Sequence, residues 1–103
     1  MSTILYTGDD WVTVGNITGS TLTYSQCSEI EVKVIVNGRA VLTLTKTGGD
    51  ITAVSNPQQF EYTVDKTETA LFKCGTVAFQ VSITANGNKM TSTSGEITLK
   101  NPK

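Results

Sequence analysis

The sequence predicts an all-β protein, an antiparallel β-sandwich of seven to nine short strands with one short helical turn. Its longest runs alternate apolar and polar residues, which is the period of a half-buried strand. Such runs fold back on one another at Asn37-Gly38 and at Asn86-Gly87. Asn-Gly suits the two positive φ values of a type I′ hairpin turn. Threonine and valine are prominent, and β-branched residues are favoured in strands.

Two short strands flank a turn at the start of the chain. Ile4 to Thr7 is the first, Gly8-Asp9-Asp10 is the turn, and Trp11 to Val14 is the second. We expect Trp11 to lie in the core or at its edge, where it would anchor the N-terminal segment; stacking on a sugar is the functional alternative. The polar segment that follows predicts a loop, with a further short strand over Thr21 to Tyr24.

The central hairpin runs from Ile30 to Thr45 and organises the rest of the chain. Its first arm is predicted to bury one face, formed by Ile30, Val32, Val34 and Val36. In its second arm Ala40, Leu42 and Leu44 are predicted to share one face of the strand. Val41, Thr43 and Thr45 alternate with them and are predicted to lie on the other face.

The middle of the chain predicts two more strands and a helical turn. After the turn Thr47 to Asp50, Ile51 to Val54 is a short strand that ends before Pro57. Phe60, Tyr62 and Val64 then alternate with polar residues as a half-buried strand. Asp65 and Glu68 have the spacing of a capping box, so we expect a turn or two of helix over Lys66 to Phe72, stopped by Gly75.

A second long hairpin closes the chain. One arm has a strict apolar face made of Val77, Phe79, Val81 and Ile83. The return arm, Lys89 to Ser94, has Met90 as its one bulky apolar residue, which predicts an edge or solvent-facing strand. Ile97 to Leu99 is the last short strand.

The length of the chain indicates one domain over residues 1–103. Charge and hydrophobicity argue against nucleic acid and a membrane as partners. The net charge of −1 gives no electrostatic footprint for nucleic acid, which usually needs clustered Lys and Arg. No stretch approaches the roughly 20 apolar residues of a membrane span. Met1 to Gly15 lacks the basic start and apolar core of a signal peptide, so we expect a chain made in the cytoplasm and left unprocessed.

The two cysteines, Cys27 and Cys74, are expected to be reduced, because a chain without an export signal meets a reducing cytosol. A bridge between them is the alternative and would contribute on the order of 4 kcal/mol in the chain-entropy model. Zinc usually needs four ligands, and two cysteines without any histidine do not supply them. We therefore predict no metal site and no cofactor.

We expect no enzymatic activity and assign no catalytic residue. Without histidine the Ser-His-Asp and Cys-His arrangements are not available, and no glycine-rich phosphate loop follows a strand and opens a helix. Two pairs of carboxylates, Glu29 with Glu31 and Asp9 with Asp10, are the remaining candidates for acid–base chemistry. Glu29 and Glu31 project from a strand beside Lys33, which is typical of a solvated face.

One pattern in the second half of the chain resembles that of a protein family. It runs through Thr67 to Phe72, Gly75, Val77 to Val81, the turn Asn86-Gly87, Ser92 to Ser94 and Gly95 to Thr98, and it touches Gly8 to Asp10 near the start. In this order the segments are similar to those of small β-sandwich proteins encoded among the structural genes of tailed bacteriophages. The chain differs from them at Ser82, where an arginine often stands.

The resemblance implies an immunoglobulin-like sandwich and a non-enzymatic virion structural protein, as a capsid decoration, tail or baseplate component assembled in the bacterial host cytoplasm. Its partners would be other virion proteins, met as a homo-oligomer or on a capsid or tail lattice, with the Lys89 to Ser94 edge as a contact. The alternatives are a host-adhesion domain or a carbohydrate-binding module. The latter needs an exposed aromatic platform built from Trp11, Tyr6, Tyr24 and Tyr62.

Overall fold

A computed structural model describes residues 4–17 and 21–102 of the chain. Within these residues it has nine strands, one 3₁₀ turn and one short α-helix. The strands are β1 (Ile4–Tyr6), β2 (Trp11–Asn16), β3 (Glu29–Val36), β4 (Arg39–Thr45), β5 (Ile51–Ala53), β6 (Gln59–Val64), β7 (Gly75–Ala85), β8 (Asn88–Thr93) and β9 (Ile97–Lys100). The 3₁₀ turn is η1 (Tyr24–Gln26), and the helix is α1 (Lys66–Thr69).

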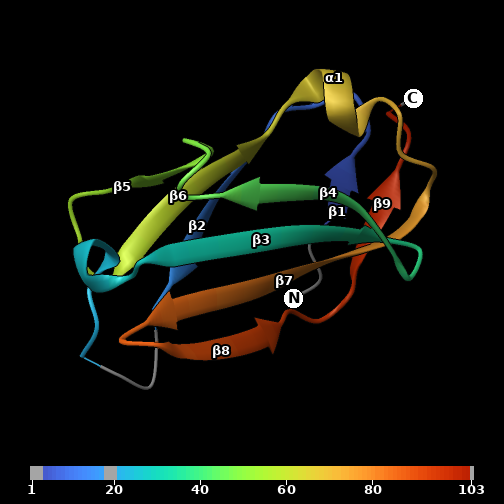
Figure 1. Ribbon diagram of the computed structural model, residues 1–103. Helices are drawn as coiled ribbons and strands as arrows, with labels where there is room; N and C mark the ends of the chain where they lie inside the picture. Colours follow the sequence, from blue (N-terminus) through green and yellow to red (C-terminus); the bar gives the residue numbers. More distant parts are fainter. Residues whose placement is uncertain (1–3, 18–20, 103) are drawn as a thin grey trace.

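The strands form two facing sheets of unequal width (Figure 1). The larger has the order β1-β9-β7-β3-β4, and β8 pairs with β7 on the same side as β9. The smaller has the order β2-β6-β5. In an immunoglobulin sandwich β2, β6 and β5 would be strands B, E and D, while β3, β7 and the pair β8 and β9 would be C, F and G. The predicted all-β sandwich is confirmed.

Both hairpins form at the predicted Asn-Gly turns. Asn37 and Gly38 have φ values of 52° and 82°, and Asn86 and Gly87 have φ values of 53° and 78°. These are the two successive positive values that a type I′ turn requires. The predicted apolar face of β3 lies wholly in the core, whereas all residues of β8 are exposed. Within the described residues β8 pairs with β7 alone, so its prediction as an edge strand is also confirmed.

The alternation predicted for β4 is wrong at Ala40. Val34 pairs with Leu42 but Ile35 pairs with Ala40, so a β-bulge leaves Val41 without a partner residue. Ala40 is therefore turned to the outer face together with Ile35, while Leu42 and Leu44 keep the core face. The bulge arises from the pairing of β4 with β3. The alternation of residues within β4 alone therefore could not predict it.

The strand predicted over Thr21 to Tyr24 is also wrong. This segment ends in η1, because polar contacts favour a turn over an extended chain. The Gln26 side chain accepts a hydrogen bond from the Thr23 N–H at 3.0 Å. The Tyr24 hydroxyl donates to the Ile51 carbonyl at 2.8 Å, which fixes the turn to β5.

Helix α1 is shorter than the predicted Lys66 to Phe72, and its capping box does not form. The Asp65 carboxylate accepts a hydrogen bond from the Thr67 hydroxyl at 2.6 Å, and Asp65 itself makes no side-chain cap bond to the helix. The first helical N–H, that of Lys66, donates instead to the Asp10 carboxylate at 2.7 Å. Asp10, which is distant in sequence, therefore caps the helix in the role that the local pattern predicted for Asp65.

Trp11 lies in the core, as expected. Its ring centroid is 5.6 Å from that of Phe72 and 6.5 Å from that of Phe79, and its Nε1 donates to the Tyr6 carbonyl at 2.9 Å. The indole thus joins both sheets and holds β1 in place.

Both cysteines are free thiols, and the topology keeps them apart. Cys27 precedes β3 and Cys74 precedes β7, and these two strands are antiparallel over their whole shared length. The eight residues of β3 span about 24 Å, far beyond the roughly 7 Å limit for bridged Cα atoms. The alternative of a bridge between them is excluded by this geometry.

Candidate functional site

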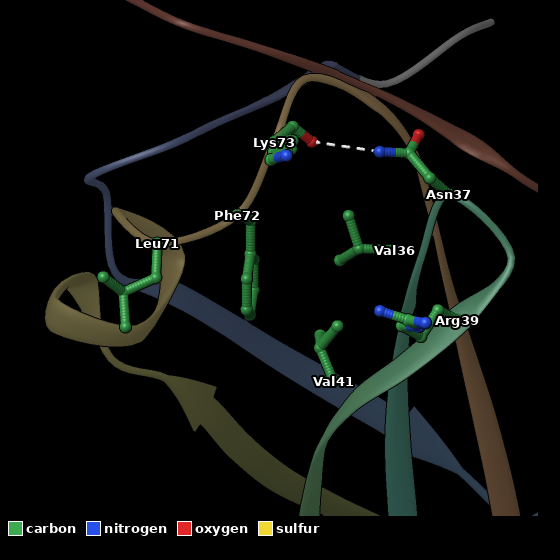
Figure 2. A pocket seen from close by; sticks show the side chains of 7 residues that line it. All are labelled: Val36, Asn37, Arg39, Val41, Leu71, Phe72 and Lys73. Carbon is green, nitrogen blue, oxygen red and sulfur yellow. Dashed lines mark hydrogen bonds between the residues drawn. The ribbon is translucent and has the colours of Figure 1, made fainter.

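A hollow of about 390 Å³ opens at one end of the sandwich, where the β3–β4 hairpin meets the segment that follows α1 (Figure 2). The hairpin supplies one wall and the segment supplies the other. The lining residues are Val36, Asn37, Arg39, Val41, Leu71, Phe72 and Lys73.

The walls of the hollow are apolar, and two of its side chains are unusually exposed. Leu71 is 77% exposed and Val41 is 43% exposed. Val41 reaches this place because the bulge re-aims its side chain. Phe72 forms the inner wall and packs on Trp11, so the hollow stands on the core of the sandwich.

The two walls are joined by the side chain of Asn37. Its Oδ1 accepts a hydrogen bond from the Thr76 N–H at 3.0 Å, and its Nδ2 lies 3.4 Å from the Lys73 carbonyl (Figure 2) and 3.3 Å from that of Cys74. Gly75, with φ of 146°, allows this approach, because a Cβ at that position would overlap Oδ1 of Asn37.

Helix α1 is held from behind by the turn between β1 and β2. The Thr69 hydroxyl is buried; it donates to the Asp9 carbonyl at 2.7 Å and accepts from the Gly8 N–H at 3.0 Å. Together with the bond from Lys66 to Asp10, these contacts fix the segment that presents Leu71. The hollow is therefore a preformed surface.

Two cations border the hollow without a carboxylate of their own. Arg39 lies opposite Val36 in the β3–β4 register and so shares its inward face, and Lys73 follows Phe72. Within residues 4–17 and 21–102, the one ion pair joins Lys33 to Glu31. Apolar walls beside two unpaired cations suit a protein segment that carries an apolar side chain next to a carboxylate.

The carboxylate pairs singled out from the sequence make structural contacts. Glu29 accepts hydrogen bonds from the hydroxyl of Thr47 at 2.6 Å and from its N–H at 3.2 Å, and the hydroxyl bond lowers the pKa of Glu29. Glu31 lies 3.8 Å from the Lys33 ammonium. A general acid needs a raised pKa, so the contacts of Glu29 are the opposite of what such chemistry requires.

The other pair, Asp9 and Asp10, lies in the turn that fixes α1, where a backbone carbonyl and a carboxylate serve as acceptors. Among the described residues no group of three or more potential metal ligands lies together, and no helix is long and apolar enough to cross a membrane.

The four aromatic residues of the carbohydrate hypothesis do not form one surface. Trp11 and Tyr62 are buried. Tyr6 and Tyr24 lie at opposite ends of β7. Tyr6 pairs with Lys100 near the start of this strand, and Tyr24 lies near Cys27, beside its end. The Tyr24 ring is also covered by the Lys46 ammonium, 4.3 Å from its centroid.

Comparison of the chain with models of protein families, with curated proteins and with solved structures found no match. Of the hollow, the sequence indicated Val36 as a core residue and Asn37 as a turn residue, and it placed Leu71 and Phe72 in the predicted helical segment. It gave no signal for Arg39, Val41 and Lys73, which come together through a bulge and a contact between distant segments.

Proposed function

We propose that this chain is a non-enzymatic virion structural protein of a tailed bacteriophage, a capsid decoration, tail or baseplate component that acts by binding other virion proteins. The phage assignment is supported by the resemblance of the segments from Thr67 to Thr98. The single observation that supports protein binding is the preformed hollow, with Leu71 exposed at its rim and two cations left unpaired beside it.

The hollow provides a favourable contact of modest size. Covering a leucine side chain contributes about 1.5 to 3 kcal/mol. Each carboxylate brought to Arg39 or Lys73 adds about 0.2 to 1 kcal/mol at an exposed site. A lattice repeats such a contact many times, so copies held by a shell or by one another gain occupancy through effective concentration.

A second contact is available on β8, which has a free edge in the described part of the chain. Its residues alternate, and those whose N–H and C=O groups point to that edge are Lys89, Thr91 and Thr93, because Ser94 N–H bonds to the Phe79 carbonyl on the other side. An unpaired edge is a template for a neighbouring strand. A homo-oligomer or a lattice contact would use it.

The test is co-sedimentation with particles of the parent virus, with light scattering to detect a homo-oligomer. Leu71→Asp should lower retention on particles or weaken the oligomer at least tenfold, because it places a charge on the apolar rim. Arg39→Glu should weaken the same binding by roughly twofold or more, because it replaces an attraction of about 0.2 to 1 kcal/mol by a repulsion of similar size. Lys100→Glu makes the same charge reversal on an exposed residue outside the hollow and should bind like the unaltered chain.

Equal binding of all three variants would remove the hollow from the proposal. A chain that stays monomeric, does not sediment with the particles and binds an oligosaccharide on an array would replace the structural role by carbohydrate binding.

A further inference from the structure

The smaller sheet ends at β2, and the position beside it holds no strand in the described residues. In a sandwich of the constant type the order of that sheet is A-B-E-D, so β2, β6 and β5 account for B, E and D. The segment that would supply strand A is β1, but β1 pairs in parallel with β9 in the other sheet. Within residues 4–17 and 21–102, one strand position is therefore vacant.

The vacancy leaves part of the larger sheet uncovered on its inner side. Met90 and Ser92 lie opposite Ile83 and Val81, and directly opposed residues share a face, so all four project toward the interior. Ile83 is buried, yet Met90 is 45% exposed. The inner face of β8 is therefore only partly covered at Met90.

A groove of about 510 Å³ follows this strip at Val81 and Ser92, and a smaller hollow of about 170 Å³ continues it at Ile83 and Met90. The floor of the groove is made of core side chains, among them Tyr62 of β6 and Phe79 and Val81 of β7. Val12 and Val14 of β2 form one rim, and the end of β8 forms the other. The groove thus opens from the side of the sandwich onto core residues between β2 and β8.

The edge of β2 supplies unpaired backbone groups along the groove. The N–H of Ile17 bonds to the Gln58 carbonyl, so odd-numbered residues of this strand face β6. The N–H and C=O groups of Val12, Val14 and Asn16 then point to the vacant side. Val12 and Val14 are 63% and 48% exposed, and the strand has no charge and no proline, which are the usual devices against edge pairing.

We propose that this groove binds one extended segment of a partner protein, which adds to the free edge of β2 as a fourth strand of the smaller sheet. A strand placed about 4.8 Å from β2 lies over the inner face of β8, because facing sheets are about 10 Å apart. It pairs with three edge residues and covers Met90 and Val81. The inference rests on this vacancy and does not depend on the hollow.

The occupant is a single segment and not the β2 edge of a second folded copy. In a copy-to-copy pairing both larger sheets would project into the same space under the joined strands. A lone segment of about six residues, about 20 Å long, matches β2 in length. Its inward side chains are apolar, to meet Phe79 and Val81, and its outward side chains are polar.

An added strand tests the site in the full chain. Six alternating threonine and valine residues are joined ahead of Met1 through about ten Gly and Ser residues, a linker that spans about 17 Å. The start of β1 lies close to the groove, because Leu5 lines it. A tethered segment reaches a millimolar effective concentration, which makes weak pairing measurable.

The readout is amide hydrogen exchange, residue by residue. Exchange should slow about tenfold at Val12, Val14 and Asn16, whereas Thr13, already bonded to β6, should keep its rate. The matched control has proline at the two central positions of the added segment and should show no slowing. Val14→Pro removes one edge donor without touching the β6 ladder and should reverse most of the protection.

Unchanged exchange at Val12 and Val14, or equal slowing with the proline segment, would overturn the proposal. Slowing at Lys89, Thr91 and Thr93 instead would place the segment on β8 and overturn it as well. Protection at Val12 and Val14 in a dimeric species would mean that the segment enters the neighbouring copy, which supports the same site.

Discussion

Replacing Gly75 with alanine should destabilise the fold through a specific clash with Asn37. Gly75 has φ of 146°, a region that residues with a Cβ rarely adopt. The new Cβ would overlap Oδ1 of Asn37, so this side chain must leave its place. With it go the 3.0 Å bond from the Thr76 N–H and the two longer contacts with the carbonyls of Lys73 and Cys74.

The expected cost is about 3 to 4 kcal/mol. Backbone strain at this φ contributes about 1 to 2 kcal/mol. The short hydrogen bond contributes about 1 kcal/mol, and the two longer, exposed ones contribute about 0.5 kcal/mol each. The total is a large part of the roughly 5 to 15 kcal/mol that holds a domain together.

A double-mutant cycle separates strain from clash. Asn37→Gly removes the side chain but keeps a residue that accepts the observed positive φ. In that background Gly75→Ala should cost only the strain, about 1 to 2 kcal/mol, which leaves a coupling of about 2 kcal/mol. Urea unfolding followed by fluorescence of the single tryptophan, Trp11, measures each corner of the cycle. If Gly75→Ala costs the same in both backgrounds, Asn37 is not the cause.

Three further predictions concern the turn, the thiols and the pH dependence. Gly38→Val should cost about 1 to 3 kcal/mol in urea unfolding, because a β-branched residue resists a positive φ; a neutral effect would contradict the type I′ turn. Cys74 is exposed and should react with dithionitrobenzoate at once, whereas burial raises the pKa of Cys27 and should make it slow, and a reducing agent should leave the Tm unchanged. Burial also raises the pKa of Tyr62 to about 12. The tyrosine pKa in the unfolded state is about 10, so between about pH 10 and 12 the unfolded state loses the phenol proton while the folded state retains it. The free energy of unfolding should therefore fall as the pH rises from about 10 to 12. Tyr62→Phe should remove this fall.

The features that the sequence predicted correctly are those set by neighbouring residues. The turns at Asn37-Gly38 and Asn86-Gly87 depend on two adjacent side chains, and the core face of β3 depends on a period of two. The exposed return strand followed from its scarcity of apolar residues. Each of these patterns depends on a few neighbouring residues, so contacts with distant segments do not change the local structure that it predicts.

The features that it missed are set by contacts between distant segments. The capping role given to Asp65 passed to Asp10 across the fold, and the alternation around Ala40 failed at a bulge that depends on pairing with β3. The candidate site has the same origin. Leu71 could be recognised as apolar, but its exposure beside Arg39 depends on where the β3–β4 hairpin meets the segment after α1.

The hollow and the groove lie toward opposite edges of the larger sheet. The hollow borders β4 and the groove borders β8, and these strands are on the two sides of β7 and β3 (Figure 1). Two proteins could therefore bind one copy without competing for the same edge. Contacts between unlike surfaces join copies head to tail, whereas a two-fold contact stops at a dimer. Trp11 lies between the two surfaces, in contact with Phe72 of the hollow and Phe79 of the groove. Its fluorescence should respond to either partner, and separate titrations would show whether both are held at once.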